Sequence, residues 1–164
     1  MLAQRLIALL ETHADALTQT VLNDLAMDPR TQSLQLPQDE LEARVFATYH
    51  SLGEWIGEAN DDRLRAAYES WGAMRFRQEM SIGEVGYALI LVKHHLRRFV
   101  RDHGLIELEL SGDRLVSEFF DRAMYYLARG YEDEAARHDA PAEAVAGRRR
   151  GTRMGHERQG LYEC

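Results

Sequence analysis

The most constraining feature of this 164-residue chain is the segment 115–131, whose apolar side chains cover most of a helical circumference. Helical spacing places Leu115, Phe119 and Tyr126 on one stripe, and a second stripe adjoins it. The second stripe consists of Val116, Phe120, Met124, Leu127 and Tyr131. A helix in a domain with one core normally shows an apolar face somewhat wider than about 100°. This helix must therefore be covered on more than one side.

Two kinds of cover are compatible with the second stripe. A second copy of the chain is the simplest, because two-fold homodimers are the commonest oligomers and an exposed patch of this kind marks an interaction surface. We therefore predict a homodimer whose interface contains Val116, Phe120, Met124, Leu127 and Tyr131. The alternative is that the first helix or the segment 105–112 covers this stripe and leaves a monomer.

The rest of the chain predicts further helices around this one. Apolar residues recur at helical spacing, and the predicted helices are 2–27, 37–56, 61–74, 82–103 and 111–137. Asp61 or Asp62 is the expected cap of the third, while Ser81 and Glu84 form a capping box before the fourth. The chain contains only three prolines and 45% of its residues are apolar. We predict an all-α bundle of five or more helices.

The chain divides into one domain and one tail. Residues 1–138 carry the helical pattern, whereas residues 139–164 have no apolar period and include Arg148, Arg149 and Arg150. We expect 139–164 to be a mobile, arginine-containing tail, because it offers no apolar stripe that could dock.

Charge and cysteine content exclude several classes of protein. Acidic residues outnumber basic ones by 27 to 20, which gives a net charge of −7 and argues against a nucleic-acid-binding domain. The one cysteine, Cys164, cannot form an internal disulfide or a cysteine-rich metal site. The apolar run at residues 6–10 is too short for a secretory signal or a membrane span. We expect a cytoplasmic protein without a membrane partner.

Few residues suggest chemistry. His94 and His95 are adjacent on the fourth predicted helix, so they cannot share a metal in the way that helical positions i and i+4 can. Either remains a weak candidate for an axial haem ligand, and a structural role is the alternative. The paired carboxylates lie mostly at helix starts or in charge runs, where they cap helices or face water. We predict no catalytic residues, no metal site and no enzymatic activity.

Two segments carry a resemblance to a known family. The first runs from Trp71 through Arg75, Gln78 and the Ser81 cap into the aliphatic helix that follows, and the second is Phe120–Tyr131. Together they resemble the amino-terminal domain of the RsbR/RsbRD family, the RsbT co-antagonists of the stressosome. The resemblance extends over roughly residues 2–137, and its motifs are mostly ones that bear the fold.

The resemblance implies a globin-like helical domain without haem, dimeric, and active as a sensory or interaction module. It supplies no catalytic residues. In that family a STAS or kinase output domain normally follows, whereas here the tail follows. We therefore expect a non-enzymatic sensory domain that acts through dimerisation and signalling-protein partners. The alternative is a ligand-binding sensor that holds haem or a small apolar molecule between its helices.

Overall fold

A computed structural model describes residues 2–31, 36–58, 60–103 and 106–148 of the chain. These residues form five α-helices and one 3-10 turn, with no strand among them, which confirms the all-α prediction. The elements are α1 (Leu2–Met27), η1 (Pro29–Thr31), α2 (Gln38–Glu58), α3 (Asp61–Arg77), α4 (Ile82–His103) and α5 (Ile106–Arg148).

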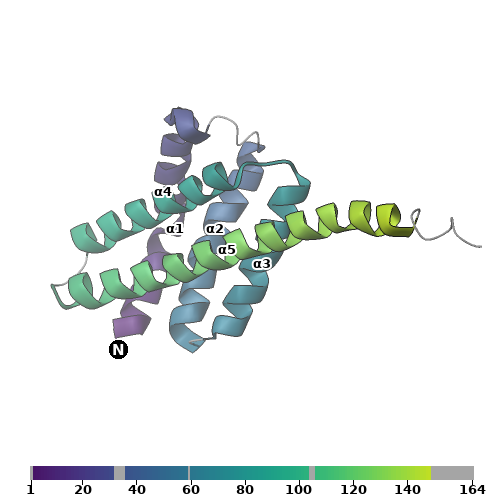
Figure 1. Ribbon diagram of the computed structural model, residues 1–164. Coiled ribbons are helices and arrows are strands. Elements are labelled where there is room, and N and C mark those ends of the chain that lie inside the picture. The colour runs from purple at the N-terminus through teal and green to yellow at the C-terminus, as the bar shows by residue number, and fades with distance from the viewer. Residues whose placement is uncertain (1, 32–35, 59, 104–105, 149–164) are drawn as a thin grey trace, which may run out of the picture.

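Helix α5 is the centre of the bundle. It runs across α3 and lies beside α4, and its yellow end projects beyond the other helices (Figure 1). Its contacts are most extensive with α3 and then with α4, and it also touches α1 and α2. The α5 side chains that these helices bury to 1% exposure or less are Val116, Phe119, Phe120, Ala123 and Leu127.

This arrangement corrects the predicted dimer interface. Val116, Phe120 and Leu127 belong to the core of the single chain. Met124 is partly buried and faces α4, where a Cβ added to Gly86 would lie 3.1 Å from its Cε. Tyr131 is also used within the chain, since its hydroxyl donates to the Met80 carbonyl at 3.0 Å. The stripe needs no second copy, because α3 and α4 flank α5 on both sides.

Helices α3 and α5 approach so closely that only glycine fits at the crossing. A Cβ on Gly72 would collide with the Leu127 carbonyl oxygen, and a Cβ on Gly130 would collide with the carbonyl oxygen of Glu69. The two backbones are therefore in direct contact, a geometry that any larger side chain would force apart. Just beyond the crossing, the Phe76 ring packs edge-on against Tyr131, with 5.3 Å between ring centroids.

The ends of α5 differ from the prediction. The helix begins at Ile106, so no eight-residue connection precedes it, and it continues to Arg148 instead of ending near Arg137. The predicted domain boundary at 138 therefore falls inside a helix. Residues 149–164 lie outside the described part of the chain, and their mobility stays a prediction.

The two ends of α3 have local structure that the sequence patterns did not predict. Asn60, and not Asp61 or Asp62, caps α3, accepting a hydrogen bond from the Arg63 amide at 3.1 Å. At the other end of α3, Glu79 has a φ of 56°, in the left-handed region. The Met80 amide reaches back to the Arg75 carbonyl at 3.1 Å, which closes the turn into α4.

The glycine contact yields a stability prediction. We expect Gly130→Ala to lower the free energy of unfolding by at least about 1–3 kcal/mol, because the new methyl group must push two backbones apart. Gly53→Ala is the matched control, since a Cβ at Gly53 in α2 meets nothing within 4 Å. That change should raise stability by about 0.5–1 kcal/mol through helix propensity. Urea unfolding of both variants measures the difference, and equal effects would contradict the close crossing.

Candidate functional site

An apolar cavity lies between α2, α3 and α4, and Leu25 of α1 also contributes to its lining. Its volume is about 40 Å³. We call it the arginine cavity, and it is lined by Leu25, Leu36, Leu41, Arg44, Val45, Thr48, Trp71, Arg75, Val85, Ala88, Leu89 and Val92. Its walls are almost wholly apolar, and the polar groups of Trp71 and Arg75 are buried behind them.

Arg75 is the most deeply buried of these polar groups. Its side chain is 1% exposed, which makes it one of the largest fully buried side chains of the described residues. Its Nη1 donates to Gln78 Oε1 at 2.7 Å and lies 3.3 Å from the Met80 sulfur. Both Nη atoms lie 3.5 Å from one oxygen of Glu40. That separation exceeds the roughly 2.7–2.9 Å typical of a charge-assisted hydrogen bond.

A second arginine competes for the same carboxylate. Arg44 Nη2 lies 4.0 Å from Glu40 Oε1, the oxygen that also faces Arg75. Burial lowers the pKa of the Arg75 guanidinium, Arg44 lowers it further, and Glu40 partly opposes them. An arginine side chain keeps its positive charge in proteins. Two positive charges thus share one carboxylate beside the cavity.

Trp71 adds an unused donor to the same wall. Its indole Nε1 is buried and has no hydrogen-bond partner among the described residues. The guanidinium carbons of Arg44 and Arg75 each lie 5.8 Å from the centre of a ring of Trp71, within range of a cation–π interaction. A buried donor without an acceptor costs free energy.

The spacing of α3 explains why these residues meet. Leu64, Tyr68, Trp71 and Arg75 follow at intervals of four, three and four residues, which places all of them on one face of the helix. Trp71, Arg75 and Gln78 carry part of the family resemblance, but the burial of Arg75 beside Trp71 was not predicted from the sequence. The available signal in the sequence was Arg75 itself, because it occupies the inward position that continues the apolar stripe of α3.

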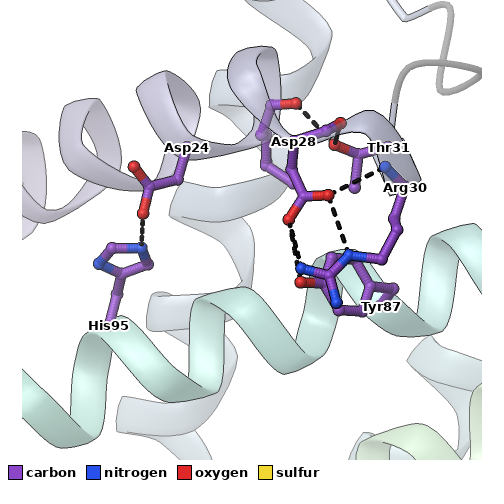
Figure 2. A network of polar contacts seen from close by, with 7 residues as sticks. Asp24, Asp28, Arg30, Thr31, Tyr87 and His95 are labelled. Carbon is purple, nitrogen blue, oxygen red and sulfur yellow. Dashed lines mark hydrogen bonds and ion pairs between the residues drawn. The ribbon is translucent and has the colours of Figure 1, made fainter.

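The histidine candidates lie elsewhere. His94 is exposed, whereas the Nε2 of the partly buried His95 lies 2.7 Å from Asp24 Oδ2 on α1 (Figure 2). Neither residue lines the arginine cavity. Their positions favour the structural role over haem ligation, since His95 ties α4 to α1.

The same α1–α4 boundary carries a denser network around Asp28 (Figure 2). The Asp28 carboxylate accepts from Arg30 Nε at 3.0 Å, from Arg30 Nη2 at 2.9 Å and from the Tyr87 hydroxyl at 2.9 Å. The Arg30 guanidinium also lies 4.1 Å from the centre of the Tyr87 ring. The hydrogen bonds from Arg30, and to a smaller extent the one from Tyr87, hold the pKa of Asp28 well below its usual range. The network fixes the end of α1 against α4.

In the described part of the chain, no group of three or more histidine, cysteine, aspartate or glutamate side chains is placed to hold a metal ion. None of the described helices is long and apolar enough to cross a membrane. The arginine cavity is therefore the candidate functional site.

The Asp28 network predicts a pH-dependent contribution to stability. Because the folded-state pKa is depressed, the ionised carboxylate stabilises the fold above its unfolded pKa of about 3.9, and this contribution is lost as the pH falls below it. We expect Asp28→Asn to lower the melting temperature at pH 7. The difference from the wild type should shrink as the pH falls toward 3.

The matched control is Asp15→Asn on the exposed side of α1. This variant should follow the wild-type curve at every pH, because its carboxylate faces water. Thermal unfolding across the pH series measures all three proteins. A difference for Asp28→Asn that stays constant with pH would contradict the charge network.

Comparisons of the chain with protein-family models, with curated proteins and with solved structures find no match.

Proposed function

We propose that this protein is a non-enzymatic sensory and protein-interaction domain, globin-like and of the RsbR amino-terminal type. Two features support the proposal. The helical architecture agrees in class with what the resemblance implies. Two of the motif residues, Trp71 and Arg75, also line one cavity, and Arg75 donates a hydrogen bond to the third, Gln78.

The path of α5 is the observation that carries the proposal. Its inner turns supply core residues such as Phe119 and Phe120, and the same helix continues to Arg148 beyond the other helices (Figure 1). A rearrangement of the core therefore acts directly on a rigid element that leaves the bundle. Helix shifts of this kind are an established means of passing a signal from one site to another.

Dimerisation is part of the proposal, on a different surface from the one first predicted. Tyr125 on α5 and Ile90 on α4 are large apolar side chains with 59% and 49% exposure. An ion pair of 2.7 Å joins Lys93 to Asp121. Ile90 lies one turn before Lys93 and Tyr125 one turn after Asp121, so both lie on the outer face of the α4–α5 pair. An exposed tyrosine beside an aliphatic residue is typical of an interface.

The alternative function was a sensor that holds haem or a small apolar molecule, and the arginine cavity gives no support to haem binding. Pockets for ligands of drug size or larger measure roughly 300–1,000 Å³, far above the volume of the arginine cavity. His94 and His95 both lie outside that cavity. A small molecule in the core remains compatible with the geometry. We place the domain in the cytoplasm as part of the proposal.

The dimer can be tested with charge substitutions on two exposed surfaces. We expect light scattering to give twice the chain mass of 18.8 kDa for the wild type at micromolar concentration. The double variant Ile90→Glu, Tyr125→Glu should be a folded monomer, because two carboxylates would have to be desolvated in the interface.

Phe46→Glu on α2 is the control, since Phe46 is 51% exposed on another helix. That variant should remain dimeric. A wild-type mass near that of one chain would contradict self-association, and a monomeric Phe46→Glu would assign the interface to α2 instead.

A further inference from the structure

A groove between α1 and α2 lies apart from the arginine cavity and shares no lining residue with it. Its volume is about 260 Å³. The α1 residues that line it share one face of the helix by their spacing, and they are Ile7, Leu10, Glu11 and Ala14. Sites for ligands of drug size measure roughly 300–1,000 Å³, so this groove suits a somewhat smaller organic molecule.

Gly53 keeps this groove open. On α2 the spacing of Phe46, Tyr49 and Gly53 places all three on the face that lines the groove. An apolar side chain at the position of Gly53 would enter the space beside α1, because a Cβ added there meets nothing within 4 Å. A glycine inside a helix lowers its stability relative to alanine, and no neighbouring atom requires a glycine here. The residue therefore weakens α2 and leaves a space that a ligand can fill.

The walls of the groove combine aliphatic and aromatic surface. Ile7 and Leu10 contribute hydrocarbon from α1. Across from them, Phe46 remains 51% exposed, which is unusual for a large apolar side chain of this protein. An aromatic ring packs well against the apolar part of a ligand, and its face also attracts a positive charge.

The charged side chains of the groove favour a cation. Glu11 and Glu54 line it, whereas no lysine or arginine of the described residues does. The Oε1 of Glu54 already lies 3.6 Å from His50 Nε2 and 3.4 Å from Arg63 Nη1. Glu11 is exposed and has no hydrogen-bond or ion-pair partner among the side chains that the structure describes. One carboxylate that solvent can reach is thus available to a positively charged ligand.

We propose that the α1–α2 groove binds a small organic ammonium ion, namely a primary amine attached to one ring or to a short hydrocarbon chain. The hydrocarbon part fills the space beside Gly53 and packs against Ile7 and Phe46. The ammonium group lies at the edge of the groove, where it meets the Glu11 carboxylate and the face of the Phe46 ring. The proposal deepens the sensory role proposed above and rests on it for its biological meaning.

A titration with 2-phenylethylamine, which is positively charged at pH 7, tests the site directly. In a proton–nitrogen NMR spectrum, the backbone amide peaks of residues 7–14 and 46–54 should move, and those of residues 116–130 should not. We expect a dissociation constant of about 0.1–1 mM, as is reasonable for a ligand with so few atoms. Peaks of the groove that stay in place, or that move no more than those of α5, would overturn the proposal.

Two analogues of the same shape test the recognition of charge. In 2-phenylethanol a hydroxyl replaces the ammonium group, and in phenylacetate a carboxylate takes its place. We expect 2-phenylethanol to bind about five- to tenfold more weakly, because an exposed ion pair and an exposed cation–π contact are each modest. Phenylacetate should not bind measurably. Equal affinity of either analogue and the amine would contradict recognition of a cation.

Two variants assign the binding to the groove. Glu11→Gln should weaken the binding of 2-phenylethylamine about two- to fivefold and leave that of 2-phenylethanol unchanged. Gly53→Leu should abolish the binding of both, because its side chain occupies the open space, and thermal unfolding verifies that this variant is folded. Glu42→Gln is the control, since Glu42 is an exposed carboxylate of α2 outside the groove. Wild-type affinity for the amine in Glu11→Gln or in folded Gly53→Leu would overturn the proposal.

The site and the proposed dimer can be tested separately. Because the groove lies on α1 and α2, the double variant Ile90→Glu, Tyr125→Glu should bind 2-phenylethylamine like the wild type, whatever its oligomeric state. Loss of binding in this variant while it remains folded would assign the site to the α4–α5 face and overturn the proposal.

Discussion

The contact between the backbones of α3 and α5 is the constraint on which the rest of the bundle depends. Gly72 and Gly130 allow each helix to meet a carbonyl group of the other, with no side chain between them. At this distance α3 can cover one side of α5 while α4 covers the adjoining side. A helix that is apolar nearly all round is thereby buried within one chain, and the whole fold is organised around it.

The same contact also affects the neighbouring face of α3. With Gly72 fixed against α5, Trp71 and Arg75 line the space that α3 shares with α2 and α4. A guanidinium at 1% exposure gives up its hydration, and its one carboxylate partner is shared and distant. An apolar residue at this position often makes a protein as stable or more stable. The buried arginine also donates to Gln78 at 2.7 Å, so it joins the end of α3 to the turn that follows it and to Glu40 of α2.

Much of the fold could be predicted because it depends on local patterns. The bounds of α1 and α4 follow from apolar spacing, from Asp28-Pro29 and from the capped start at Ser81. The interface prediction had another basis, since periodicity shows that two stripes of α5 need cover but not which chain supplies it. Gly72 and Gly130 were the available signal for a close approach within the chain, and their pairing across 58 positions is not visible in local spacing.

The arginine cavity was harder to anticipate for a related reason. An arginine at an inward position of α3 can be recognised from spacing, but its shared carboxylate lies 35 positions away on α2. Such a site depends on tertiary packing, so charge counts and motifs along the chain do not reveal it. His95 shows the reverse case, because a residue that attracts attention in the sequence serves in the structure to join α4 to α1.

The central claim, that α5 is the buried core of a single chain, is tested most directly by amide hydrogen exchange. The amides of residues 116–130 should be among the slowest to exchange, because they open only when the whole domain unfolds. Their protection should persist when the protein is diluted below the concentration at which any dimer dissociates. Protection that disappears on dilution while α3 and α4 stay protected would contradict the account, because it would show that a second copy covers α5.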